Sequence, residues 1–394
     1  MAVPDLGSWI PNVHRVQNVS ESFSTQSPRS SLFDTTNIYV EGLLTTNELL
    51  KQAKVPFWDS QSLKQLLSGG IGAGSQATVA SGWNSRDVLA PSPSQSPDVV
   101  IKRVRRSGEA DTEYQQDLEA VLRELHVLCH NPLRNHRNII QLTGYGWEDA
   151  ITSPILIQER AEYGTLPQYL SRFFPFAVDA YTLDSYWMSA LAICRDIATG
   201  LQALHASDIV HGDVKPENIL VCLSEEKRKN LLDKTFFDLG AVKFEGNVDE
   251  LVTAKLSDFG LSLFDLENGV GQYQGTKLWN APEVRRQTPW LSMEDLKKCD
   301  IFSYGLVVWA SVNKGRYFQP AWMNNQPTDD EAKLQFIDAA EDDFLLQEGL
   351  KVIERFSDEP KPFFRKLLRQ TLQSKSHLRG SIENIIDIMD EHIR

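Results

Sequence analysis

The stretch that decides the fold is His211-Gly-Asp-Val-Lys-Pro-Glu-Asn-Ile-Leu220. Asp213 and Asn218 lie five positions apart in it, across a loop that Pro216 stiffens by fixing its own φ angle. This arrangement can direct a carboxylate at a hydroxyl group and an amide oxygen at a metal ion. Lys215 adds a positive charge suited to a phosphoryl group in transfer. A random polar loop rarely combines these residues at this spacing, so the stretch predicts phosphoryl-transfer chemistry.

A glycine-rich stretch lies upstream, Ile71-Gly-Ala-Gly-Ser-Gln-Ala-Thr-Val79. Gly72 and Gly74 are one residue apart and let backbone amides approach a phosphate closely. Val79 follows on an expected strand, where an apolar side chain can cover a purine. Two glycines are a weak signal by themselves, because a flexible turn has the same composition.

A lysine ends the apolar run Val99-Val100-Ile101-Lys102, where it can place a cation beside a nucleotide. By itself, such a lysine is more often an edge residue whose ammonium reaches the solvent. A buried lysine needs a carboxylate partner. The expected helix Thr112–Cys129 offers Glu124, with Glu119 as the competing candidate.

Two further stretches follow, Leu256-Ser-Asp-Phe-Gly-Leu-Ser262 and Gly275-Thr-Lys-Leu-Trp-Asn-Ala-Pro-Glu283. Asp258 stands at the end of an expected strand, and Gly260 frees the backbone after it. A single carboxylate at a strand end suits magnesium, which keeps several waters and shares phosphate oxygens.

Taken in order, the five stretches resemble the glycine loop, lysine strand, H-R-D loop, D-F-G and A-P-E motifs of protein kinases. The chain is identified on this basis as a member of the eukaryotic protein kinase family, with the resemblance covering residues 65 to 392. Each motif is modest, but five in this order and spacing are very specific. Asp300-Ile-Phe-Ser-Tyr-Gly-Leu-Val-Val-Trp309 resembles the family's central buried helix, and Arg379 lies where the family pairs an arginine with the A-P-E glutamate, here Glu283.

The resemblance implies an ATP- and magnesium-dependent enzyme. The implied catalytic residues are Asp213, which would accept and orient the substrate hydroxyl, Lys215, Lys102 and its partner Glu124. Asn218 and Asp258 would hold magnesium. The implied nucleotide-binding residues are Ile71, Gly72, Gly74, Val79, Lys102, Glu159 and Ala161, with Gln158 guarding the back of the pocket.

The resemblance also implies the substrate and the fold. Lys215-Pro-Glu-Asn218 and Thr276 are similar to serine/threonine kinases, whereas Trp279 is similar to the tyrosine-kinase-like group. The implied fold is α+β and bilobal, with a small β-rich N-lobe and a larger, mainly helical C-lobe. We expect a partly disordered N-terminal extension over 1–62, the N-lobe over 63–161 and the C-lobe over 162–394. The expected C-lobe helices lie near 166–173, 186–205, 303–312, 329–340, 363–373 and 381–392.

The chain departs from the family pattern in four ways. Ala77 replaces a glycine, Gly380 replaces a proline, and Gly212 replaces the arginine of H-R-D. The fourth departure is the long interval between Asn218 and Asp258. Because that arginine usually pairs with a phosphate on the activation loop, we expect activity to depend little on phosphorylation there. The long interval contains a lookalike, Phe237-Asp-Leu-Gly240. We prefer Asp258 over Asp238, because Ala254–Ser257 has the pattern of a strand, and we expect a surface insertion near 224–250.

Composition restricts the partners. The net charge of −13 makes nucleic acid an unlikely main partner. The four cysteines are widely spaced, and the sequence shows neither a signal peptide nor an apolar run that could span a membrane. We therefore expect a protein of the cytoplasm or nucleus that acts on protein substrates without inserting into membranes; regulatory partners cannot be derived from the sequence.

Two other functions compete with a protein serine/threonine kinase. Ala77 and Gly212 suggest a pseudokinase that binds nucleotide or partner proteins, although Lys102, Asp213, Asn218 and Asp258 are all present. The His-Gly-Asp order also occurs in related enzymes that phosphorylate small molecules. A zinc site built on His126, Cys129, His130 and His136 is a weaker alternative, in which His126 and His130 lie four apart on one face of an expected helix.

Overall fold

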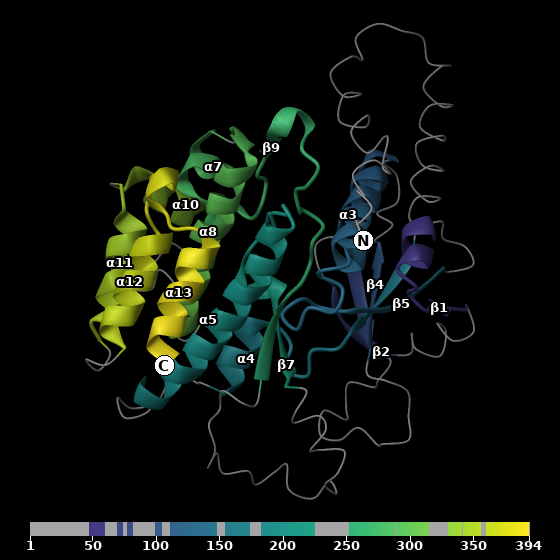
Figure 1. Ribbon diagram of the computed structural model, residues 1–394, viewed down its shortest axis with the longest axis horizontal. Helices are drawn as coiled ribbons and strands as arrows, with labels where there is room; N and C mark the ends of the chain where they lie inside the picture. The colour runs from purple at the N-terminus through teal and green to yellow at the C-terminus, as the bar shows by residue number, and fades with distance from the viewer. Residues whose placement is uncertain are drawn as a thin grey trace, which may run out of the picture.

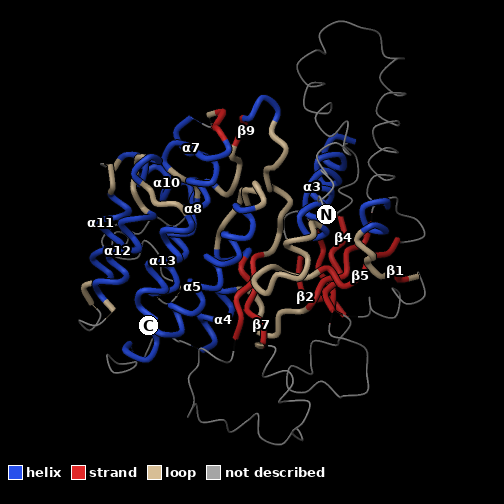
Figure 2. The backbone as a smooth tube through the Cα atoms, in the orientation of Figure 1, coloured by secondary structure: helices blue, strands red, loops and turns tan. Residues whose placement is uncertain are grey.

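The computed structural model describes residues 47–59, 69–73, 77–81, 99–104, 111–147, 154–173, 183–224, 252–287, 289–313, 315, 330–340, 342–355 and 360–393. Within these residues a sheet with one long helix forms one lobe, and a bundle of helices forms the other (Figure 1). Figure 2 shows the same division, with most strands gathered in one part and most helices in the other. The predicted α+β architecture with two lobes is confirmed.

The first lobe is built on a sheet whose strand order is β1-β5-β6-β4-β3-β2. Its strands are β1 (Phe57–Trp58), β2 (Gly69–Ala73), β3 (Ala77–Ser81), β4 (Val99–Val104), β5 (Leu142–Trp147) and β6 (Pro154–Glu159). The pairing of β1 with β5 is parallel, and the other pairings are antiparallel. The sheet therefore brings β4 and β6 side by side at its centre.

The alternation of side chains along β4 decides where its lysine lies. Successive residues of a strand point to opposite faces. Ile101 packs with Val99, Ile155 and Ile157 in a small apolar cluster. Lys102 therefore points to the opposite face, toward helix α3 (Asp111–Cys129).

The second lobe is mainly helical. Its helices are α4 (Leu166–Phe173), α5 (Leu183–Ala206), α7 (Pro282–Gln287), α8 (Met293–Val312), α10 (Asp330–Ala339), α11 (Phe344–Ile353), α12 (Lys361–Thr371) and α13 (Ile382–Ile393). The six helices expected from the sequence are present as α4, α5, α8, α10, α12 and α13. Helices α7 and α11 were not predicted. Among the described residues, no helix combines the length and apolarity needed to cross a membrane.

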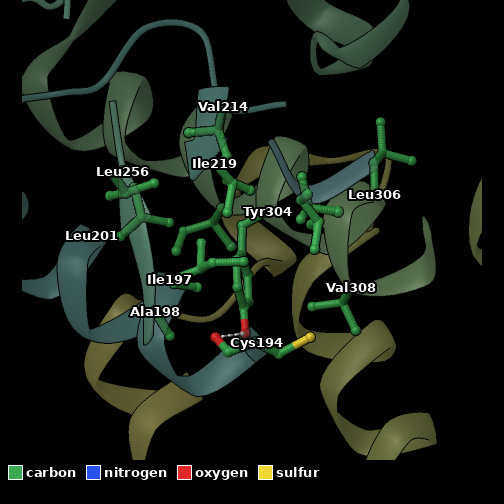
Figure 3. Packing of buried hydrophobic residues seen from close by; sticks show 14 of the residues in the cluster. Cys194, Ile197, Ala198, Leu201, Val214, Ile219, Leu256, Tyr304, Leu306 and Val308 are labelled. Atoms are coloured by element: carbon green, nitrogen blue, oxygen red, sulfur yellow. Dashed lines mark hydrogen bonds between the residues drawn. The ribbon is translucent and has the colours of Figure 1, made fainter. Parts of the chain in front are cut away.

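Helix α8 is the core of this lobe, and every residue from Cys299 to Val312 is buried. A helix that is apolar on all sides belongs inside a protein. Tyr304 of α8 packs among apolar side chains of α5 and donates a hydrogen bond of 3.0 Å to the carbonyl oxygen of Cys194 (Figure 3). The predicted buried central helix is thus confirmed.

In the described residues, two sheets of two strands each lie among the helical segments. In the first, β7 (Ile219–Leu223) pairs antiparallel with β8 (Val252–Leu256), with Ile219 opposite Leu256. Asn218 precedes one strand and Asp258 follows the other, so the pairing brings both to the same end. In the second, β9 (Val270–Gln272) pairs antiparallel with β10 (Trp290–Ser292).

The expected domain boundaries remain predictions. Residues 47–59, which the expected boundary at 62 assigns to an extension, join the described fold: residues 47–52 are helical, Leu50 is buried, and β1 extends the sheet. Most of the expected insertion, including the lookalike Asp238, lies outside the described residues, as does Gly74.

Candidate active site

The ammonium group of Lys102 joins three elements. Its Nζ lies 2.6 Å from Oε2 of Glu124 on α3 and 2.8 Å from Oδ1 of Asp258, which follows β8. Glu119, the competing partner, instead pairs with Arg123 at 3.2 Å. Residues that are 22 and 156 positions from Lys102 in sequence therefore meet at one cation.

The pKa shifts of Lys102 and Asp258 both favour the charged form of the side chain. Burial alone would lower the pKa of Lys102, but the negative charges of Glu124 and Asp258 outweigh it and raise that pKa above its ordinary value. Burial would likewise raise the pKa of Asp258, but the charge and hydrogen bond of Lys102 hold it below its usual range. In general, a protonated lysine can bind a phosphate oxygen, and an ionised aspartate can bind a metal ion.

Glu124 has a second donor that the sequence reading missed. Gln158 on β6 donates from Nε2 to Oε1 of Glu124 at 2.8 Å, while Lys102 occupies Oε2. Glu124 is 1% exposed, so both carboxylate oxygens are satisfied inside the protein. The sequence placed Gln158 at the back of the pocket, but it gave no signal that its amide faces α3.

A second cluster surrounds Asp213. Lys215 Nζ donates to Asp213 Oδ2 at 2.7 Å and to Thr276 Oγ1 at 2.8 Å. The backbone N–H of Thr276 donates to Asp213 Oδ1, also at 2.8 Å. A carboxylate in the loop before β7 is thus tied to a lysine of the same loop and a threonine 63 positions away.

Asn218 connects the two clusters. Its Nδ2 donates to the backbone oxygen of Asp213 at 2.8 Å and to Oδ2 of the same residue at 3.0 Å. Its own backbone oxygen accepts the N–H of Ser257 at 2.9 Å, directly before Asp258. Asp258 has a left-handed φ of 63°, which turns the chain where its carboxylate meets Lys102.

The loop around Asp213 is hydrogen-bonded to Asp300 of α8, whose side chain is 0% exposed. Asp300 accepts the N–H groups of His211 at 2.8 Å and Gly212 at 3.1 Å, and His205 Nε2 lies 3.0 Å away. Gly212 has a φ of 82°, and a Cβ there would lie 2.2 Å from the carbonyl oxygen of Leu261. This site therefore favours glycine where the family has arginine.

The expected nucleotide-binding residues lie around the sheet. Val79 is opposite Lys102 in the register of β3 and β4, and Gly72 is opposite Val79. The register shifts between Gly70 and Gly72, at Ile71. At the end of β6, Glu159 Oε1 lies 2.6 Å from Lys255 Nζ of β8.

Ala161 lies in the turn that follows β6, where its carbonyl accepts the N–H of Gly164 at 3.1 Å. With Glu159, it belongs to the segment that joins the sheet to α4. The family resemblance implied that both residues bind the nucleotide, and that role remains a prediction.

The histidines weighed as zinc ligands have other neighbours. The ring of His126 stacks on Phe264 with 4.0 Å between centroids, and the ring of His130 lies 6.4 Å away. In the part of the chain that the structure describes, no three His, Cys, Asp or Glu side chains are grouped to hold a metal ion.

Comparison with known families agrees with this geometry. The family pattern described as "Protein kinase domain" matches residues 67–388. The chain belongs to the protein kinase family. Within a kinase domain, the contacts above are those between the lysine strand, helix α3, the catalytic loop and the D-F-G segment.

Several curated kinases are similar to this kinase domain. The "Probable serine/threonine-protein kinase roco8" of Dictyostelium discoideum is 26% identical over 259 residues, which are 65% of this chain and 11% of the relative. "Serine/threonine-protein kinase STY46" of Arabidopsis thaliana is 25% identical over 53% of this chain and 28% of its own length. Human "Mitogen-activated protein kinase kinase kinase 7" is 25% identical over 57% of this chain and 29% of its own length. The chain therefore spans less than a third of the length of these relatives.

Proposed function

We propose that this kinase domain transfers the γ-phosphoryl group of ATP to serine or threonine hydroxyls of protein substrates. The observation that carries the proposal is the arrangement at Asp213, where one carboxylate is bonded to Lys215 and to the amide of Thr276. Asp213 would accept and orient the substrate hydroxyl, and Lys215 would place a positive charge beside the group in transfer. Lys102, held by Glu124, would bind nucleotide phosphates.

The donor set near Asp258 fits a magnesium ion. Asp258 keeps 39% of its side chain exposed, although it contacts a lysine that is only 13% exposed. The amide nitrogen of Asn218 is engaged with Asp213, which leaves its amide oxygen as the candidate ligand. Carboxylate and amide oxygens are ligands that magnesium accepts. A bound magnesium would supply charge neutralisation for the phosphates.

The metal assignment has a direct test against the lookalike aspartate. Magnesium-dependent ATP binding would be measured for Asp258→Ala and for Asp238→Ala. We expect loss of the magnesium dependence only in Asp258→Ala. Unchanged binding by that variant, with loss in Asp238→Ala, would reverse the assignment.

Preference for serine and threonine is supported by Thr276. Its hydroxyl accepts a hydrogen bond from Lys215, and its amide contacts Asp213, so it borders the place where a substrate hydroxyl would lie. The relatives named above are called serine/threonine kinases in two of three cases.

One assay separates this function from a pseudokinase and from a small-molecule phosphotransferase. The protein would be incubated with magnesium-ATP, a generic protein substrate and a panel of metabolites. We expect phosphate on serine or threonine. Intact nucleotide binding without transfer would indicate a pseudokinase, and transfer to metabolites alone would indicate a small-molecule enzyme.

A further inference from the structure

Hydroxyl groups are few in the activation segment, which runs from Asp258 to Glu283. Its sequence contains three hydroxyl side chains: Ser262, Tyr273 and Thr276. Ser262 is 2% exposed and donates to the carbonyl oxygen of His211 at 3.1 Å. Thr276 is bonded to Lys215. A phosphate on either residue would break a contact with the catalytic loop.

Tyr273, the third of these residues, is buried and hydrogen-bonded to a buried carboxylate. It is 1% exposed, and its hydroxyl donates to Oδ1 of Asp300 at 3.0 Å. The same oxygen accepts the N–H of Gly212 at 3.1 Å. One buried carboxylate therefore holds both the catalytic loop and the activation segment.

We propose that Tyr273 is a positioning residue whose hydroxyl fixes the activation segment to the catalytic loop through Asp300, without any phosphate on the segment. It lies three residues before Thr276, whose amide and hydroxyl reach Asp213 and Lys215. The inference rests on the proposed function, because the geometry that Tyr273 maintains is that of the phosphoryl-transfer site.

The backbone between Tyr273 and Thr276 has little freedom to move independently. Gly275 has a φ of 48°, and a Cβ there would lie 2.3 Å from Oδ1 of Asn280 and 2.9 Å from the Tyr273 ring. Asn280 also donates to the carbonyl oxygen of Gln274 at 2.7 Å. A displacement of the Tyr273 ring would therefore be passed on to Thr276.

The chemistry of the contact suits a permanent connection. Burial, followed by the charge of Asp300, raises the pKa of Tyr273 well above its ordinary value, so its hydroxyl remains a donor. A hydrogen bond from a neutral hydroxyl to an ionised carboxylate is stronger than a hydrogen bond between two neutral groups. In this kinase, the Tyr273–Asp300 hydrogen bond would fix the activation segment, a role that an arginine and a phosphate usually have in the family.

The test compares wild type with Tyr273→Phe, which removes only the hydroxyl, after both proteins have been treated with phosphatase. Amide hydrogen exchange would be followed in peptides covering residues 207–215 and 270–280. We expect about tenfold faster exchange in both peptides of the variant, the equivalent of one lost hydrogen bond to a charged group. The kcat for a protein substrate should fall by a similar factor, with little change in ATP binding.

Tyr304→Phe is the matched control. Tyr304 is also fully buried, and its hydroxyl also has one acceptor, but that acceptor is the carbonyl of Cys194 on α5 (Figure 3). Its loss should lower overall stability without selectively increasing exchange at 207–215 and 270–280.

Each outcome has one meaning. Exchange in Tyr273→Phe equal to wild type, or the same pattern in Tyr304→Phe, would overturn the role of Tyr273. Loss of wild-type transfer on phosphatase treatment would overturn the phosphate-free mechanism. If untreated wild type also transfers no phosphate, the proposed function fails, whereas the exchange experiment still decides whether Tyr273 connects the two segments.

Discussion

At the scale of single residues, the site depends on carboxylates whose oxygens are shared among several donors. Glu124 is held by Lys102 and Gln158, Asp213 by Lys215 and Thr276, and Asp300 by the catalytic loop and Tyr273. A buried carboxylate that loses one donor bears the full cost of that missing hydrogen bond. Replacing one of these donors should therefore lower stability or activity, even where the sequence gave little sign that the residue matters.

Gln158→Leu should loosen the attachment of α3. The change leaves Oε1 of the buried Glu124 without its donor, so the Lys102–Glu124 pair loses support. We expect kcat/KM for ATP to fall about tenfold, with faster hydrogen exchange in α3. Gln373→Leu is the control, because Gln373 is half-buried on the other lobe and its side-chain amide donates only to the Arg369 carbonyl oxygen, in an exposed hydrogen bond. Wild-type kinetics in Gln158→Leu would show that the contact does not support the site.

Gly212→Ala should destabilise the protein more than an ordinary glycine substitution does. Gly269 offers a matched comparison, because its φ is 72° but a Cβ there would meet nothing within 4 Å. Gly269→Ala should cost about 1 kcal/mol for its left-handed backbone alone. Gly212→Ala adds a clash with the Leu261 carbonyl and should cost at least about 2 kcal/mol. Chemical denaturation measures both, and equal values would contradict the close approach.

Much of the site could be predicted at this scale because short spacing determines it. Asp213, Lys215 and Asn218 lie within six residues of one another, and their loop has a recognisable composition. The contacts of Gln158 with Glu124 and of Tyr273 with Asp300 could not be predicted. They join residues 34 and 27 positions apart, and only the packing of separate elements makes them neighbours.

At the scale of elements, Glu283 of α7 forms an ion pair with Arg379, which lies just before α13. Arg379 donates from Nη1 and Nη2 to the two carboxylate oxygens of Glu283, at 2.7 and 2.8 Å. The arginine side chain is 0% exposed, and its guanidinium lies 4.8 Å from the centre of the Phe302 ring. The pair that the family resemblance predicted is present.

This pair should make stability depend on pH. Burial would raise the pKa of Glu283, but the hydrogen bonds and charge of Arg379 hold it below the ordinary value of 4.5. A lowered folded-state pKa means that the contribution is complete above pH 4.5 and is lost as pH falls through the folded-state value. Glu283→Gln should therefore cost about 3 kcal/mol near neutrality, and the difference from wild type should shrink below pH 4.5.

The free energy of unfolding of wild type and of Glu283→Gln would be measured by chemical denaturation, from neutral pH to below pH 4.5. Glu354→Gln is the control, because Glu354 and Arg365 form a pair in which both side chains are more than a third exposed. It should change the free energy of unfolding by less than about 1 kcal/mol. A difference for Glu283→Gln that stays constant with pH would contradict the assigned role.

Element boundaries were predictable where apolar spacing is regular, as in α4, α12 and α13. The expected start of α8 was wrong by ten residues, since the sequence indicated Ser303 and the helix begins at Met293. Its first turns are polar, and Ser292 caps them by accepting the N–H of Asp295. Helix α11 was missed because a short run such as Phe344–Ile353 does not distinguish a helix from a strand.

At the scale of the whole molecule, the proposed function depends on the two lobes meeting at one place. Lys102 and Glu124 come from the sheet lobe, whereas Asp258 and the Asp213 loop come from the helical lobe. The Glu159–Lys255 pair joins the lobes a second time, between the end of β6 and β8. The order of the motifs predicted that these residues meet, because it implied a kinase fold, and that fold brings the motifs together.

The most direct test of that claim is phosphoryl transfer by Asp213→Asn compared with wild type. Both proteins would be given magnesium-ATP and a protein substrate, with ATP binding measured in parallel. We predict ATP affinity within about twofold of wild type and transfer to serine or threonine at least about 100-fold slower, because a positioned base contributes that much. Transfer by Asp213→Asn at the wild-type rate would contradict the account.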